Sequence, residues 1–141
     1  MTRNLDDTLR HVFVGVADVL IPAFEKMPQA SAAGVGGETL DRILALRDDL
    51  KEPFLRGLRA AAGRPPETAA RDLNVEDPKA LAAIGLVASA AYYMSPEVRR
   101  LIGYPGQDRR PIDPDAPPDY LENNLLQPVI DRGPIYRPTP K

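Results

Sequence analysis

The side chains that most often perform catalysis are scarce in this sequence. Among its 141 residues there is no cysteine, and His11 is the single histidine. Without cysteine the chain has no thiolate nucleophile, iron–sulfur ligand, cysteine zinc ligand or disulfide. A metal site or a catalytic triad would require partners for His11 that the sequence does not offer. We therefore expect no catalytic residue, no metal site and no cofactor-binding residue in this chain.

Two pairs of neighbouring carboxylates are the next candidates for acid–base chemistry. They are Asp6 with Asp7 and Asp48 with Asp49. Two carboxyl groups can share a reaction only if both face one substrate, whereas adjacent residues of a helix point about 100° apart. Both pairs also stand where a helix is expected to begin, so helix capping explains them better than catalysis does.

Three glycines, Gly34, Gly36 and Gly37, resemble a phosphate-binding loop only superficially. No Lys-Ser or Lys-Thr follows them, and no strand clearly precedes them. We interpret them as a flexible entry to a helix that contains Leu40.

Two arginine pairs flank one aromatic turn, and this arrangement favours binding. The turn is Gly103-Tyr104-Pro105-Gly106, with Arg99 and Arg100 before it and Arg109 and Arg110 after it. Guanidinium groups on both sides of a tyrosine could hold an anion or an acidic patch of another protein, although each pair alone is typical of a solvated surface. The predicted surface therefore comprises Arg99, Arg100, Tyr104, Pro105, Gly106, Arg109 and Arg110.

The charge balance excludes a general attraction to polyanions. The chain has 18 basic and 20 acidic residues, a formal net charge of −2 and a pI near 5.4. Neither nucleic acid nor anionic lipid would be drawn to it by bulk electrostatics. We therefore expect no nucleic-acid partner.

Nothing in the apolar pattern predicts export or a membrane span. The first dozen residues have no apolar stretch of the kind an export signal requires, which favours a cytoplasmic location. The longest weakly polar stretch, Ala80 to Met94, is shorter than the about 20 residues that cross a bilayer.

Before residue 105 the apolar residues recur at helical spacing. A first helix is predicted with Asn4 as its N-cap and with Pro22 just beyond its end. Its Val-rich sequence leaves a strand as the alternative. A long loop from Pro22 to Gly37 follows.

Further helices are predicted from proline, aspartate and glycine positions. Three of them are residues 40–47, residues 66–73 and residues 96–101, the last followed by Gly103. Another is capped by Asp48 or Asp49, has Pro53 at its fourth position and is closed by Gly63. The longest begins at Pro78 and is capped by Asp77. The helix from Pro78 has an inward stripe and is rich in Ala and Gly, which would let neighbouring helices approach closely, so we expect it at the centre. Its predicted stripe is Leu81, Ile84, Ala88, Ala91 and Tyr92.

The predicted fold class is all-α, in two parts. Residues 1–104 form a small helical bundle, and residues 105–141 form a long, proline-rich, extended tail with a short helix around residues 120–126. The tail holds nine of the 16 prolines and nine sizeable apolar groups. Disordered tails are usually poor in such groups. We therefore expect the tail to need a surface, either on its own bundle or on a partner.

A set of short motifs resembles a known family. The set is Leu20-Ile21-Pro22 with Met27-Pro28, residues 30–34, Leu40-Asp41-Arg42, Leu55-Arg56-Gly57-Leu58, and Tyr92-Tyr93-Met94-Ser95-Pro96 through Gly103-Tyr104-Pro105-Gly106. Over residues 20–106 the chain resembles the small subunit of membrane-linked sugar and gluconate dehydrogenases, the gluconate 2-dehydrogenase subunit 3 type.

This resemblance implies a non-catalytic accessory subunit in a heterodimer. Its partner would be a large FAD-dependent dehydrogenase of the glucose-methanol-choline type that oxidises sugar or polyol hydroxyls, with the FAD in the partner. Many small subunits of the family carry a twin-arginine export signal; none is seen here, which implies either a cytoplasmic branch or a signal elsewhere.

We predict that tyrosines as well as the arginines near residue 104 contact the large subunit. These tyrosines are Tyr93, Tyr104, Tyr120 and Tyr136. The alternative is a stand-alone helical module that binds a protein or a small ligand, with the loop and tail closing over it. A small autonomous enzyme is the least favoured hypothesis, because the sequence offers so few side chains that could perform catalysis.

Overall fold

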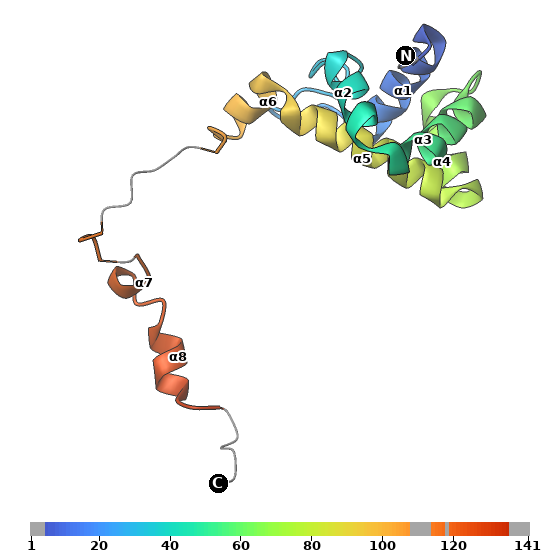
Figure 1. The fold of residues 1–141 in the computed structure, drawn as a ribbon. Helices are drawn as coiled ribbons and strands as arrows, with labels where there is room; N and C mark the ends of the chain where they lie inside the picture. The colour runs from blue at the N-terminus through green and yellow to red at the C-terminus, as the bar shows by residue number, and fades with distance from the viewer. Residues whose placement is uncertain (1–4, 108–113, 118, 136–141) are drawn as a thin grey trace. The chain divides into compact units, whose positions relative to one another are not determined.

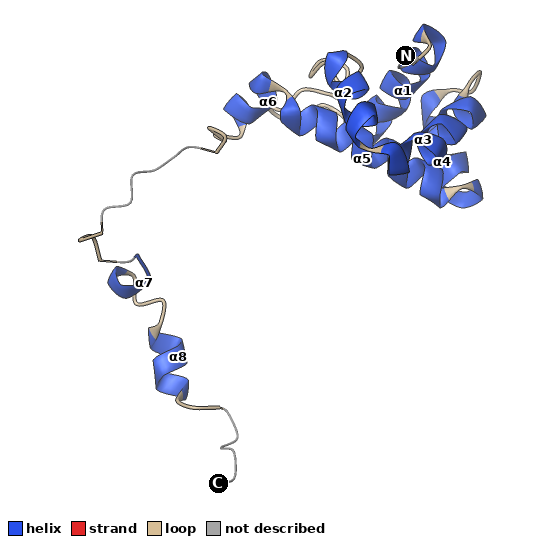
Figure 2. Cartoon of the chain, in the orientation of Figure 1, coloured by secondary structure: helices blue, strands red, loops and turns tan. Residues whose placement is uncertain are grey.

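The structure is a computed structural model that describes residues 5–107, 114–117 and 119–135. The chain divides into two compact units, Met1–Gln107 and Asp108–Lys141, which we call unit 1 and unit 2. The described residues are mostly helical and contain no strand, only an isolated bridge between Phe24 and Met27 (Figure 2). The all-α expectation is confirmed for these residues, and the extended, partner-wrapping tail stays a prediction.

Six helices build unit 1 (Figure 1). They are α1 (Asp7–Leu20), α2 (Glu38–Leu46), α3 (Asp48–Ala61), α4 (Pro66–Glu76), α5 (Pro78–Met94) and α6 (Pro96–Leu101). Each lies where the spacing of apolar residues and the proline positions predict a helix. The strand alternative for the first segment is wrong, because α1 is one continuous helix that ends just before Pro22.

Two predicted helix starts need correction. Asp6 occupies the N-cap of α1, and Asn4 lies outside the described residues. Arg47 is the N-cap of α3, so Asp48 and Asp49 lie inside its first turn, and Pro53 is an interior residue that leaves the Asp49 carbonyl without its usual donor. The reason is local: α2 ends at Leu46, and Arg47 alone joins the two helices.

α5 lies at the centre, as predicted, and packs against every other helix of unit 1. Its closest neighbour is α3, where a Cβ added to Gly57 would lie 3.0 Å from both the Ala80 Cβ and the Ile84 Cδ1 atoms. Of the predicted stripe, Ile84, Ala88, Ala91 and Tyr92 are buried, whereas Leu81 is half-buried. Close packing of helix on helix therefore depends on small residues on both sides.

The start of α5 is fixed by a cap and an ion pair. The Asp77 carboxylate accepts the Ala80 amide at 3.1 Å and the Arg56 Nε of α3 at 2.6 Å. The Arg56 side chain, followed by the Ala80 amide, holds the pKa of Asp77 below its ordinary value. The aspartate–proline signature thus both begins α5 and ties it to α3.

The long loop from Pro22 to Gly37 is a folded part of the bundle. Ala30 and Val35 are buried. The Tyr92 hydroxyl of α5 donates a 2.7 Å hydrogen bond to the Pro28 carbonyl, and the Ser31 amide donates to the Asp18 carboxylate at 2.7 Å. The loop therefore completes the core rather than lying over it as a mobile cover.

We predict that Tyr92→Phe lowers the free energy of unfolding by about 1 kcal/mol, because the Pro28 carbonyl loses its donor. Burial raises the pKa of Tyr92 above its ordinary value of 10.0. The folded state thus favours the neutral phenol of Tyr92. The stability that this preference contributes is complete at pH values below the pKa of Tyr92 in the unfolded chain. It is lost as the pH rises through the higher pKa of Tyr92 in the folded chain. Urea unfolding should show the wild type losing more stability than Tyr92→Phe above pH 10.0.

The exposed Tyr93→Phe is the matched control, with an unfolding midpoint close to that of the wild type. Equal losses in the two variants would contradict the role assigned to the Tyr92 hydroxyl.

Candidate partner-binding surface

The turn after α6 presents Tyr104 to solvent. Gly103 and Gly106 have φ values of +69° and +97°, a region that favours glycine. Between them, the Tyr104 amide donates to the Arg99 carbonyl at 2.9 Å. Tyr104 is 48% exposed, Pro105 is exposed and Gly106 is half-buried. The glycines therefore reverse the chain so that the aromatic ring stays at the surface.

Arg99 connects this turn to the end of α5. Its Nε donates to the Tyr93 carbonyl at 3.0 Å, so one guanidinium satisfies a C-terminal carbonyl of α5. Tyr93 is 56% exposed and its ring packs edge-on against Tyr92, with centroids 5.4 Å apart. Through Arg99, the structure links Tyr93 and Tyr104, and Arg100 is an exposed residue in the last turn of α6.

Three of the predicted contact residues lie outside the described residues. They are Arg109, Arg110 and Tyr136. The predicted convergence of two arginine pairs on Tyr104 therefore stays a prediction.

The described part of unit 2 contains two short helices, α7 (Asp119–Glu122) and α8 (Gln127–Arg132). Its described large apolar side chains are all exposed, from 39% for Leu126 to 75% for Ile135. They are Tyr120, Leu121, Leu125, Leu126, Val129, Ile130 and Ile135. The described part of unit 2 thus has helices but no buried apolar side chain of its own.

Three of the apolar residues of unit 2 lie on one side of α8. Leu126, Val129 and Ile130 are spaced three and four residues apart, which places them on one helix face. On the other side, the Gln127 amide donates to the Asp131 carboxylate at 2.7 Å. α8 is therefore a short amphipathic helix whose apolar face is solvent-exposed.

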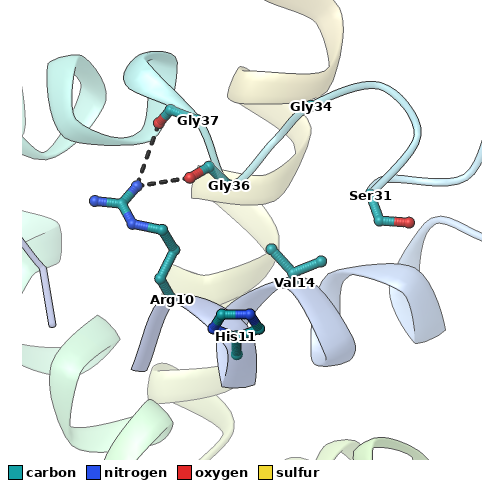
Figure 3. Close-up of a pocket in the computed structure, with 7 residues that line it drawn as sticks. All are labelled: Arg10, His11, Val14, Ser31, Gly34, Gly36 and Gly37. Atoms are coloured by element: carbon teal, nitrogen blue, oxygen red, sulfur yellow. Dashed lines mark hydrogen bonds between the residues drawn. The ribbon is translucent and has the colours of Figure 1, made fainter. Parts of the chain in front are cut away.

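A separate hollow of about 370 Å³ lies between α1 and the loop before α2 (Figure 3). Its lining residues are Arg10, His11, Val14, Ser31, Gly34, Gly36 and Gly37. His11 is exposed and its Nδ1 lies 2.8 Å from the Asp7 carbonyl oxygen, a contact within α1. Of the residues that line this hollow, the sequence analysis considers only His11 and the three glycines as candidates for a function.

Arg10 is the residue of this hollow that sequence reasoning missed. Its guanidinium donates to the Gly36 carbonyl at 2.6 Å and to both Asp41 carboxylate oxygens at 2.9 and 3.1 Å. Glycine carbonyls, not amides, thus face the cation (Figure 3), which is the opposite of a phosphate loop. These bonds join α1 to the start of α2.

The interpretation of the glycines as a flexible entry is also corrected at Gly36. A Cβ there would lie 2.5 Å from the Val14 Cγ2 atom. Gly36 is needed for this close approach of the loop to α1, which also brings its carbonyl to Arg10.

Two features are absent from the described residues. No group of three or more His, Cys, Asp or Glu side chains is placed to hold a metal ion. In the same part of the chain, every helix is too short or too polar to cross a membrane.

The chain was also compared with known proteins. No protein-family model, curated protein or solved structure matches it.

We predict that Gly36→Ala destabilises unit 1 by about 1–3 kcal/mol, because the new methyl group overlaps Val14. Val14→Ala removes the obstructing methyl, so the double variant should be more stable than the sum of the two single losses implies. Urea unfolding of the wild type, the two single variants and the double variant measures the coupling free energy between positions 14 and 36. Strict additivity would show that the contact between Gly36 and Val14 does not limit the loop.

Proposed function

We propose that this chain is a non-catalytic small subunit that binds and stabilises a large FAD-dependent dehydrogenase acting on sugar or polyol hydroxyls. The single observation that carries the binding role is the exposed apolar surface of unit 2. Contiguous exposed apolar groups mark interaction sites in folded proteins. A partner surface that covers them would gain up to about 2 kcal/mol for each side chain that becomes fully buried.

The composition of this surface supports a protein partner. Aromatic residues dominate the energetics of protein interfaces, and Tyr104 and Tyr120 are both about half exposed. Arg100 is an exposed residue of α6, and its guanidinium is able to make a forked pair with a carboxylate of the partner. Unit 2 and the turn at Tyr104 therefore supply apolar and directional contacts of the kind an interface needs.

The identity of the partner rests on the sequence resemblance. The motifs between Leu20 and Gly106 resemble those of the small subunit, and the large subunit of such enzymes carries the FAD. In this proposal the present chain contributes surface and the partner contributes the flavin and the catalytic bases. The cytoplasmic location of the complex stays a prediction.

A second candidate function is favoured by the hollow beside Arg10. Its volume of about 370 Å³ lies in the range of small-molecule pockets. One observation argues against this ligand-binding function. The Arg10 guanidinium already bonds to the Gly36 carbonyl and the Asp41 carboxylate, so little of the positive charge of Arg10 remains to attract a ligand. A stand-alone module of this kind would be stable and colourless alone, and a ligand would raise its melting temperature.

Co-expression with a candidate large subunit tests the first proposal. We expect a yellow complex in which both chains and the flavin absorption elute together from size-exclusion chromatography. A chain that elutes alone, with the flavin in a separate peak, would contradict the accessory-subunit role.

Paired substitutions on α8 test which surface binds. Val129→Asp together with Ile130→Asp should weaken association with the large subunit by at least about 100-fold, because two charges would be buried against apolar groups. The control is Val75→Asp on α4, where the valine is 77% exposed, more than either α8 residue, and lies in unit 1. Binding is measured by titration with the purified large subunit. Unchanged affinity in the α8 variant would exclude α8 from the interface.

A further inference from the structure

A second hollow, of about 260 Å³, is lined by residues of α1, α2 and α3 and is distinct from the hollow beside Arg10. Four leucines line it, and each packs against the core while part of its side chain stays exposed. They are Leu5 just before α1, Leu9 of α1, Leu44 of α2 and Leu55 of α3. An apolar group that displaces water from such a hollow is stabilised by the hydrophobic effect.

Three charged side chains also line this hollow, and their balance is positive. Lys51 and Arg59 lie four residues before and four residues after Leu55, so all three share one face of α3. Asp6, the N-cap of α1, is the acidic residue of the lining. Two cations against one anion beside four leucines favour a ligand that carries both an apolar group and a negative charge.

Arg59 is the cation best able to bind such a ligand. It is exposed, and within the part of the chain that the structure describes its side chain forms no ion pair. Lys51, in contrast, already pairs with the carboxylate of Asp48. A guanidinium presents paired N–H donors that match the two oxygens of a carboxylate, so a carboxylate is the negative group that Arg59 fits best.

We propose that this hollow binds a small amphipathic carboxylate, whose alkyl chain lies among the four leucines and whose carboxylate pairs with Arg59. The occupant is small because the hollow has less volume than the about 300–1,000 Å³ of pockets that enclose drug-sized ligands. The proposal does not rest on the proposed function, since the residues that line this hollow are separate from the candidate partner-binding surface.

Calorimetric titration of the full chain with octanoate, octanol and octylamine tests the chemistry of the ligand. Octanoate should bind saturably, one per chain, and octanol about tenfold more weakly because it cannot pair with Arg59. Octylamine should bind more weakly still, since the cations repel it. From butanoate to hexanoate to octanoate, the affinity should rise by up to about fourfold for each methylene. Absence of saturable binding, or equal affinity for octanoate, octanol and octylamine, would overturn the proposal.

Leucine-methyl NMR locates the bound octanoate. The methyl signals of Leu5, Leu9, Leu44 and Leu55 should shift with one common dissociation constant. Leu86 of α5 is 54% exposed and does not line this hollow, so its signals are the control for non-specific contact with apolar side chains. Shifts of equal size and midpoint at Leu86 would show that octanoate coats exposed apolar groups in general, and the site would be wrong.

Substitution of the charged residues tests how the carboxylate is held. Arg59→Gln should weaken octanoate binding by about tenfold and leave octanol binding unchanged. Arg71→Gln on α4 is the matched control, an exposed arginine that does not line the hollow, and should change neither affinity.

Asp6→Asn should tighten octanoate binding by about two- to threefold, because asparagine caps a helix as well as aspartate does but does not repel the carboxylate. Circular dichroism should be the same for all variants, since positions 6, 59 and 71 are exposed. An octanoate affinity that is unchanged in both Arg59→Gln and Asp6→Asn would contradict recognition of the carboxylate at this hollow.

Discussion

The fold depends on how closely α3 can approach α5. Gly57 lies against Ala80 and Ile84 at a distance that no larger residue allows without displacement. This contact holds the two helices together, and Arg56, one residue earlier, reaches the Asp77 carboxylate that caps α5. Phe54, one turn before Gly57, packs on Phe13 of α1 with ring centroids 5.3 Å apart. A single glycine thus lets α3 approach α5 closely at the place where Arg56 reaches the Asp77 cap, while Phe54 of the same helix packs on α1.

A central helix in so small a bundle has a consequence for the surface. α5 contacts all five other helices of unit 1 and still leaves Leu86 and Tyr93 more than half exposed. A helix with no charged residue between Lys79 and Glu97 has no polar side to offer to water. The apolar sequence that makes α5 a good centre therefore also leaves apolar side chains on its outer face.

Local signals predicted most of the helices, and contacts between distant residues explain the misses. Proline and aspartate placed α5 correctly because capping is local. The start of α3 was misplaced because Arg47 alone separates it from α2, leaving no room for a separate cap. The contacts of Arg10 with Gly36 and Asp41 join positions that no local pattern relates. For the candidate surface, the Tyr104 turn followed from its glycines, whereas the hydrogen bond from Arg99 to the Tyr93 carbonyl was not predicted, because it depends on how α6 folds back on the end of α5.

The described residues expose apolar side chains in two different settings. The exposed face of α5 belongs to a long helix that five other helices of unit 1 already hold in place. The apolar groups of α8 belong to a six-residue helix with no buried residue, and such a short helix gains its stability only when another surface covers it. α8 can therefore take the shape that a partner imposes, and a surface that covers α8 stabilises the helix as it buries the apolar face.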